Sequence, residues 1–254
     1  MEQLLAQVPL LMLIASRIAG VTTASPIFSG RFMVGQTRVA FTFLLALLIL
    51  PGVKVTPEAT TGTALIAGCV LELLVGLMIG FVNLLVFAAV QMAGGLLDMD
   101  LGFLNAQIMD PVSGRSEAIT GTFFQMLGVV VYLGFNGHHW LLRGLAESYG
   151  TIPVAGLTSV VEGPLYVANM FAEILVASVQ MVLPFMGMML LVSVAMAGLA
   201  RVVPQLHIFS VGMGVKAVGG LLLLAIMLPY FSGFLEQLFD RGHTELLRTL
   251  QLMR

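Results

Sequence analysis

The sequence predicts an all-α integral membrane protein with about six hydrophobic segments, and two observations support this fold class. Hydrophobic residues make up 59% of the 254 residues and charged residues only 9%, and the mean hydropathy of +1.03 lies far above that of soluble globular domains. Several apolar runs are also long enough to cross about 30 Å of hydrocarbon, which takes about 20 helical residues.

These hydrophobic segments follow one another along the whole chain. Four runs have the length of a membrane-spanning helix, and two more are good candidates; in chain order all of them are 4–19, 32–50, 63–93, 119–135, 170–199 and 208–231. The N-terminal run follows Glu2, where a signal peptide would carry Lys or Arg, so we interpret it as a mature helix. The single Cys69 excludes an intrachain disulfide.

Basic residues do not orient these segments. If the segments alternate between the two sides of the membrane, the cations divide almost evenly, and the positive-inside rule predicts no orientation. One side collects Lys54, Arg143, Arg241, Arg248 and Arg254, and the other collects Arg17, Arg31, Arg38, Arg115, Arg201 and Lys216. Simple serpentine spanning is therefore less well supported than the hydrophobic peaks alone suggest.

The segment 63–93 carries a small and polar stripe on one helix face. Its members recur at steps of three and four residues, and they are Glu72, Gly76, Gly80, Asn83, Phe87 and Gln91. Glycines let two backbones approach closely, and Glu72 would cost roughly 2.5 to 3.5 kcal/mol if it met lipid at mid-bilayer. We expect protein to shield Glu72. Packing within the chain, a contact with another subunit and a wet pore remain open alternatives.

Two later segments have similar faces. In 170–199, Glu173 and Gln180 lie seven residues apart on one face, and Pro184 is expected to kink the helix. In the last segment Gly212, Lys216 and Gly220 step by four, so Lys216 needs a carboxylate partner or a carbonyl-lined cavity, unless it snorkels to water. Pro204 is expected to break the chain between two antiparallel helices, 170–199 and 208–231.

Residues that carry catalytic or metal chemistry are scarce. The adjacent His138 and His139 would point about 100° apart on a helix and have no ligand partner at metal spacing, so we expect a turn at Asn136 and Gly137 instead. No phosphate loop, dinucleotide fingerprint or nucleophile motif is present. We therefore expect no catalytic residue, no metal and no cofactor.

The stretch MDPVSGRSE (109–117) interrupts the apolar sequence near its centre, and two acids that we interpret as loop-type residues, Asp98 and Asp100, lie upstream of it. Together with FNGHHWLL, RVVPQLHIFSVGMGVKAVGGLLLL and the N-terminal SRIAGVTTASPIFSGRFMVGQTRVAFTFLLALLILP, it closely resembles the FliR family of flagellar biosynthetic proteins, the R subunit of the type III export gate. The resemblance covers essentially the whole chain. Gly35 and Gly214 stand where that family's pattern has proline, which loosens a turn without removing a chemical group.

The resemblance implies a fusion of two smaller gate subunits, the P and Q proteins, in a closed helical assembly around a central channel. The P-like part would be residues 1–165, the Q-like hairpin 166–240 and a short C-terminal tail 241–254. The helices would form tilted, broken hairpins, and their polar faces would pack on neighbouring subunits. The expected subunit-packing residues are Glu72, Gly76, Gly80, Asn83, Glu173, Gln180, Gly212, Lys216 and Gly220.

In that family the loop between the third and fourth hydrophobic segments plugs the channel, and here it maps to residues 103–117. Its apolar stopper and turn residues would be Phe103, Leu104, Ile108, Met109, Asp110, Pro111 and Gly114. Non-helical backbone at membrane depth is tolerated only when it is buried in protein or lines a wet cavity, which agrees with this role. From the residues alone, an ordinary surface loop is the alternative.

The resemblance also implies partners and a location. The partners would be P-like and Q-like subunits, the A and B membrane subunits of the flagellar export apparatus, exported unfolded flagellar proteins and membrane lipid, with no nucleic acid. The location would be the bacterial inner membrane within the flagellar basal body, partly raised to the periplasmic side. A virulence-type export-gate homologue is one alternative. Another is a secondary transporter or channel with Glu72, Glu173 and Lys216 as sites.

Overall fold

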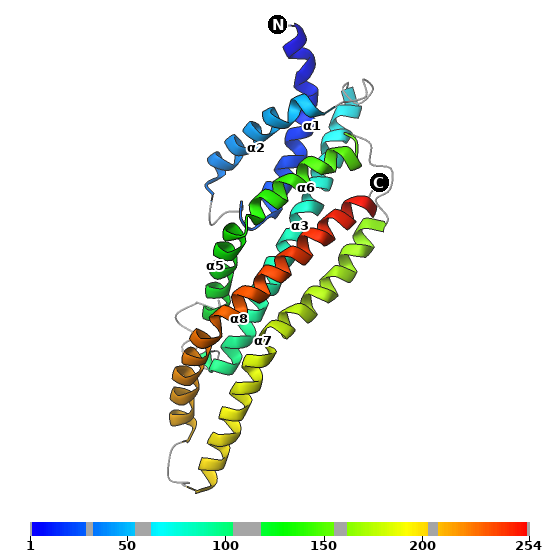
Figure 1. Cartoon of the computed structure of the whole chain (residues 1–254). Coiled ribbons are helices and arrows are strands. Elements are labelled where there is room, and N and C mark those ends of the chain that lie inside the picture. Colours follow the sequence, from blue (N-terminus) through cyan, green and yellow to red (C-terminus); the bar gives the residue numbers. More distant parts are fainter. Residues whose placement is uncertain are drawn as a thin grey trace. The chain divides into compact units, whose positions relative to one another are not determined.

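The computed structural model describes residues 2–28, 33–53, 62–103, 118–154, 162–202 and 208–252, and these are almost entirely α-helical (Figure 1). The helices are α1 (Glu2–Ala24), α2 (Gly35–Ile49), α3 (Gly62–Leu101), α5 (Ile119–Gly134), α6 (Gly137–Thr151), α7 (Glu162–Val202) and α8 (Ile208–Leu252). A single 3₁₀ turn, η1 (Leu50–Gly52), follows α2. Within these ranges there is no strand, and the predicted all-α class is confirmed.

Three of the helices are too long for an upright membrane span. Helices α3, α7 and α8 have 40, 41 and 45 residues. At about 1.5 Å per residue these lengths are about 60 to 68 Å, roughly twice the thickness of the hydrocarbon layer. Such helices must tilt strongly or extend beyond the hydrocarbon. The even division of Lys and Arg residues, which assumes short alternating spans, therefore does not describe this fold.

The described ranges contain four helical segments that are long and apolar enough to cross a membrane: Gly35–Gly52, Gly62–Leu101, Asn169–Val202 and Gly212–Gln251. A fifth is possible if α5 and α6, which are bent by 69° at their junction, count as one broken span. The N-terminal apolar helix, Val8–Ala24, is shorter. The six predicted hydrophobic segments therefore lie on helices, but only four or five have the length of a span.

Helix α6 was missed by the sequence prediction, which placed only a turn at this point. The turn exists, since Asn136 has a left-handed φ of 57°, but a helix of 15 residues begins directly after it at Gly137. Arg143 and Glu147 make this segment too polar to register as a hydrophobic run.

The chain divides into two compact units, each built from segments far apart in sequence. Unit 1 comprises Met1–Val86, Asn136–Ala172 and Phe239–Arg254, and unit 2 comprises Phe87–Phe135 and Glu173–Leu238. Helices α3, α7 and α8 each contribute one part to unit 1 and another to unit 2. Residues 241–252, where the resemblance implies a short tail, continue α8 as part of unit 1. The division into P-like and Q-like parts stays a prediction.

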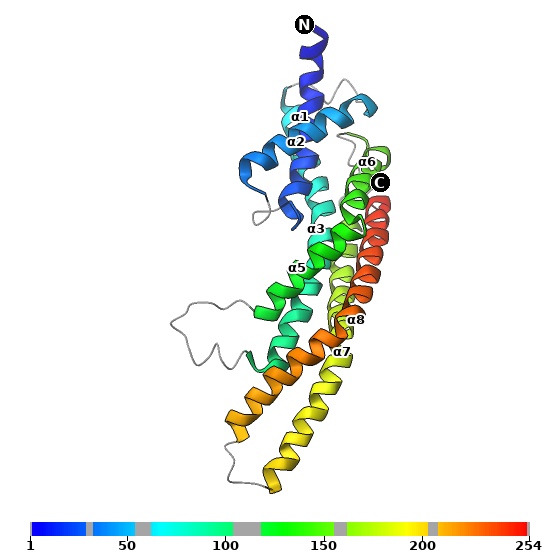
Figure 2. The ribbon, with the colours of Figure 1, turned by 60° about the vertical axis from the view of Figure 1, so that its left-hand side comes forward.

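Within unit 2, α7 and α8 lie side by side and run antiparallel (Figures 1 and 2). Pro204, which is expected to break the chain between them, lies outside the described residues. Helix α7 continues on both sides of Pro184, the position of the expected kink.

Each unit has its own apolar core. In unit 1 this core includes Leu13, Ile14 and Ile18 of α1, all fully buried, together with Leu145 of α6. In unit 2 the ring of Phe124 from α5 meets that of Phe231 from α8 edge to face, with 5.0 Å between their centroids. Large apolar side chains are nevertheless exposed along α2, α7 and α8, among them Leu48, Leu190, Leu191 and Ile226. Such faces need lipid or protein to cover them.

Candidate functional site

The polar stripe on α3 lies against α1 of the same chain. The two helices approach so closely that a Cβ atom added at Gly20 would lie 2.5 Å from the carbonyl oxygen of Leu73. A Cβ at Gly76 would collide with the backbone oxygen of Arg17, and one at Gly80 would lie 2.9 Å from the oxygen of Val21. These three glycines therefore set the distance between α1 and α3, because any larger residue would force the backbones apart.

At this crossing Glu72 is paired with an arginine. Both side chains are buried, Arg17 at 0% exposure and Glu72 at 2%. The Nε of Arg17 donates to one carboxylate oxygen at 2.5 Å, and Nη2 donates to the other at 3.0 Å. This two-point geometry is the strongest arrangement of an arginine with a carboxylate.

The same guanidinium also holds α6. Nη1 donates to the Ser148 hydroxyl at 3.0 Å, and Nη2 donates at 3.1 Å to the carbonyl of Ile152, the C-cap residue directly after α6. The guanidinium carbon of Arg17, Cζ, lies 4.2 Å from the centroid of the Tyr149 ring, which is a cation–π contact. The Tyr149 hydroxyl donates to the carbonyl of Ile14. One arginine thus joins three helices of unit 1.

The pairing explains why charged groups are tolerated in such an apolar chain. An isolated buried charge is very costly, whereas a pair whose remaining hydrogen-bonding atoms are also satisfied can be buried. The next polar residue of the stripe follows the same rule, since the amide nitrogen of Asn83 donates to the Ser25 hydroxyl at 2.7 Å. Helix α1, with Ser25 directly after it, therefore already contacts four of the residues predicted to pack on another subunit, namely Glu72, Gly76, Gly80 and Asn83. Their contact with another subunit stays a prediction.

In unit 2, the two helices that flank the candidate plug loop are tied together at its base. Asp98 of α3 is fully buried, and its oxygens accept from the backbone N–H of Thr120 at 3.0 and 3.2 Å and from the Thr120 hydroxyl. Thr120 lies in the first turn of α5, whose own N-cap residue, Ala118, makes no side-chain cap bond. Asp98 therefore caps α5 from the preceding helix and places a negative charge at its positive end.

The helices approach closely at this base as well. A Cβ added at Gly94 would lie 2.6 Å from the Cα of Gly121, so two glycines face each other across α3 and α5. Gly102 then ends α3 with a φ of 79°, a conformation that other residues rarely adopt. The described residues on either side of the candidate plug loop are therefore held close together by the packing of α3 against α5.

A second acid lies near the base. Asp100 of α3 is half-buried and interacts electrostatically with Lys216 of α8, although one of its oxygens, Oδ2, is buried without a hydrogen-bond partner among the described residues. Nearby, a Cβ added at Gly220 would collide with Leu101 and lie 3.2 Å from a methyl carbon of Met189. Lys216 therefore has an acidic neighbour within its own chain, close to where the candidate plug loop begins.

The other predicted residues are placed as follows. Phe103 is partly exposed just after α3, while Leu104, Ile108, Met109, Asp110, Pro111 and Gly114 lie outside the described residues. Glu173 and Gln180 are exposed on α7, and Gly212 is half-buried on α8, 3.8 Å from Met196 if a Cβ is added. Their roles in subunit packing and in the plug stay predictions.

Sequence reasoning missed Arg17, Asp98 and Ser148 as members of these clusters. Arg17 was counted only as one of eleven cations, although a basic residue three positions before Gly20 in an apolar run is itself a signal for a buried partner. Asp98 and Asp100 were interpreted as loop residues, which is wrong, because α3 continues to Leu101.

Comparison with known proteins places this helical arrangement in a family. The family model described as bacterial export proteins, family 1, matches residues 8–242, which is most of the chain. The chain belongs to this family. The match includes all of unit 2, most of unit 1, the Arg17–Glu72 pair and the base of the candidate plug loop.

Curated relatives are similar over almost their whole length. The chain is 30% identical over 227 residues to the flagellar biosynthetic protein FliR of Pectobacterium carotovorum subsp. carotovorum, which covers 88% of this chain and 86% of the relative. It is 29% identical to the FliR protein of Bacillus subtilis (strain 168), over 91% of each chain. It is 26% identical to that of Escherichia coli (strain K12), over 88% of this chain and 86% of the relative.

Proposed function

We propose that this chain is a structural subunit of the membrane gate through which the flagellar type III export apparatus passes unfolded flagellar proteins. The observation that carries the proposal is the family match over residues 8–242, together with relatives named as flagellar biosynthetic proteins across nearly the full chain. The resemblance of MDPVSGRSE and the later motifs to the export-gate R subunit supplies the specific role.

The fold supports a role in assembly. Apolar side chains are exposed along much of α7 and α8, for example Leu190, Leu191 and Ile226, while the buried Glu72 of unit 1 is paired within the chain. Exposed apolar faces on helices longer than an upright span suit contact with other helical subunits. We assign these faces to P-like and Q-like partners, and further contacts to the A and B membrane subunits of the apparatus.

We place the subunit in the bacterial inner membrane within the flagellar basal body, with part of it raised to the periplasmic side. The length of α3, α7 and α8, about 60 to 68 Å, is consistent with helices that continue outside the hydrocarbon. A virulence-type export gate is less well supported, because the relatives named above are flagellar. A transporter would need Glu72 free to bind substrate or protons, whereas Arg17 occupies it.

Within this function, residues 103–117 would close the channel. The support is at the base of the loop: Asp98 and the glycine pair Gly94 and Gly121 hold its two ends together, and Gly102 turns the chain out of α3. A loop anchored in this way can change its conformation without separating the helices that carry it.

The test deletes residues 104–114 and keeps Gly102, Asp98 and Thr120. We expect the complex to assemble with normal amounts of its P-like and Q-like partners but to leak small ions, because the anchoring contacts remain while the apolar segment is lost. Ion conductance and pull-down are measured in the same cells. The control replaces residues 54–61, another inter-helix connection, with a Gly/Ser segment of equal length. Normal assembly without increased conductance would remove the plug assignment.

A second measurement separates the gate from the plug. In cells lacking the native gene, the intact chain should restore secretion of flagellar subunits, and it should co-purify with the P-like and Q-like proteins. A chain that purifies alone or only as a homo-oligomer would contradict the gate function itself, whatever the deletion does to conductance.

A further inference from the structure

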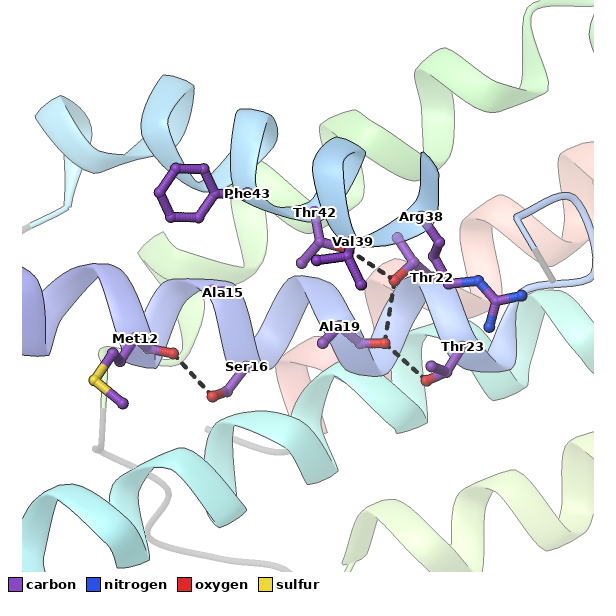
Figure 3. A pocket seen from close by; sticks show the side chains of 10 residues that line it. All are labelled: Met12, Ala15, Ser16, Ala19, Thr22, Thr23, Arg38, Val39, Thr42 and Phe43. Carbon is purple, nitrogen blue, oxygen red and sulfur yellow. Dashed lines mark hydrogen bonds between the residues drawn. The ribbon is translucent and has the colours of Figure 1, made fainter. Parts of the chain in front are cut away.

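A groove lies between α1 and α2 in unit 1, apart from the charged clusters described above (Figure 3). Its volume is about 420 Å³, and its walls are mostly apolar, with Ala15 and Ala19 on α1 and Val39 and Phe43 on α2. Small side chains on α1 face larger ones on α2, so the two helices leave room between them. This volume falls within the range of sites that bind small molecules.

The two ends of the groove differ in polarity. Met12 and Phe43 lie at one end, and Arg38 and Thr23 lie at the other (Figure 3). The groove therefore suits an elongated ligand with an apolar body and a polar, anionic head. A uniformly apolar ligand would offer Arg38 neither a counter-charge nor a hydrogen-bond acceptor.

Arg38 lacks a partner in the described part of the chain. Its Nε is buried and makes no hydrogen bond. The neighbouring hydroxyls do not accept a hydrogen bond from this Nε. Thr23 donates to the Ala19 carbonyl at 2.7 Å, and Thr22 shares a hydrogen bond of 3.3 Å with Thr42. A buried donor of a cationic group without an acceptor is costly, so the site calls for an anion. A guanidinium binds phosphate particularly well, because its planar donors match two phosphate oxygens.

The dimensions favour a lipid chain over a protein helix. Met12 and Thr23 are eleven residues apart on α1, about 16 Å at 1.5 Å per residue, which is half of the roughly 30 Å hydrocarbon layer. A protein helix is about 10 to 12 Å wide, so it would lie over the groove rather than within it. An acyl chain from one leaflet fits the length without exceeding the volume.

The depth of Arg38 agrees with this orientation. It lies in the first turn of α2, at the start of the membrane-capable segment Gly35–Gly52. Cations at the end of a span lie where lipid headgroups lie, and the apolar end of the groove then points toward the interior of the bilayer. We propose that this groove binds one phospholipid, with its phosphate on Arg38 and an acyl chain along Ala15, Ala19 and Phe43.

The first test measures lipid retention by the export complex after purification in detergent. Phosphorus is counted per complex, and the affinity for fluorescent phosphatidylglycerol is titrated for wild type, Arg38→Gln and Ala15→Leu. Arg38→Gln removes the charge and Ala15→Leu fills the apolar part, so each should weaken binding at least tenfold. Arg201→Gln, which changes an exposed arginine near the end of α7, is the matched control and should bind as wild type does.

Competitors distinguish the source of the anion. An alkyl phosphate should displace the probe, and inorganic phosphate should displace it poorly, because it cannot use the apolar groove. Displacement by inorganic phosphate at the same concentration, with no effect of Ala15→Leu, would show a simple anion site and overturn the proposal. Equal binding by wild type and both variants would overturn it as well.

The second test identifies the occupant in intact membranes. A photoreactive phenylalanine analogue replaces Phe43, and the products of irradiation are separated by mass. A lipid adduct that decreases when Arg38→Gln is added supports the proposal. A cross-link to another polypeptide in place of lipid would show that the groove is a subunit interface and would overturn it.

Discussion

Helix α3 buries acids in both of its halves, but it satisfies them in different ways. In the unit 1 half, Glu72 has a full counter-charge, with two hydrogen bonds from Arg17. In the unit 2 half, Asp98 has backbone and hydroxyl donors from the start of α5. Asp100, which is only half-buried, interacts electrostatically with Lys216, and its Oδ2 has no hydrogen-bond partner among the described residues. Along the helix, toward the end that carries the candidate plug loop, the partners weaken from a cation at Glu72 to neutral donors at Asp98 and to no hydrogen bond at Oδ2 of Asp100.

This difference indicates that the two halves of α3 differ in how freely their surroundings can rearrange. Around Glu72, removal of any partner leaves a buried charge, so unit 1 has little freedom to rearrange. Around Asp100, the interactions are longer-ranged and weaker, so the same helix can change its surroundings at lower cost. Substitutions at the acids and their partners test this gradient, and their effects should decrease in the same direction.

The largest effect is expected for Glu72→Ala. It leaves the guanidinium of Arg17 buried without its carboxylate, which should destabilise the protein by about 3 to 5 kcal/mol. The measurement is the amount of intact chain in membranes and the midpoint of its thermal aggregation in detergent. The double variant Arg17→Met with Glu72→Met removes both charges and should recover much of the loss. A Glu72→Ala protein with wild-type stability would contradict the pairing.

A smaller loss is expected for Gly76→Ala, which tests the close approach of α1 and α3. The added methyl collides with the backbone of Arg17, and overpacking of this kind costs about 1 to 3 kcal/mol. Gly187→Ala on α7 is the control, because the added Cβ meets nothing within 4 Å beyond its own stretch of helix backbone, and it should be neutral or slightly stabilising. Equal thermal midpoints for the two variants would show that α1 and α3 are not this close.

Sequence reasoning could place the hydrophobic helices and recognise that the α3 stripe avoids lipid, because both signals are local periodicities. It could not find the partner of Glu72, since Arg17 lies 55 positions earlier and contacts between helices leave no local pattern. It also interpreted Asp98 and Asp100 as loop-type acids, because acids close to glycines resemble turn residues, whereas the helix ends only at the positive φ of Gly102. The candidate groove was missed for a similar reason: Arg38 in an apolar run has no partner that the sequence would show.

The next prediction concerns Asp98, which caps α5 from a neighbouring helix. Asp98→Ala should cost about 0.5 to 2 kcal/mol, the range for loss of an N-cap, and should expose the first amides of α5. Hydrogen exchange at Thr120 and its neighbours measures the effect. Asp98→Asn, which keeps an acceptor but loses the charge, should give an intermediate rate, and Asp240→Ala, at an exposed acid of α8, should change nothing there. Unchanged protection in Asp98→Ala would contradict the cap.

The smallest effect is expected at Lys216, the weakest of these interactions. No ion pair within 4.0 Å joins it to an acid among the described residues, and its interaction with Asp100 acts over a longer distance. Lys216→Met should leave membrane insertion intact and reduce recovery of the P-like and Q-like partners by up to about fivefold, which corresponds to the roughly 1 kcal/mol of a partly exposed pair.

Two further variants show which interaction of Lys216 matters. Lys216→Arg keeps the charge and should restore partner recovery, and Asp100→Asn should reproduce part of the loss if the acid positions the lysine. Pull-downs are compared at equal amounts of chain in the membrane, so that a change in insertion does not imitate a change in binding. Full recovery of both partners by Lys216→Met would mean that the lysine only extends to water and that the α7–α8 hairpin docks through Gly212 and Gly220. In that case Asp100 would have no role in assembly. The weakening of the acids' partners along α3 would then affect the stability of the protein alone.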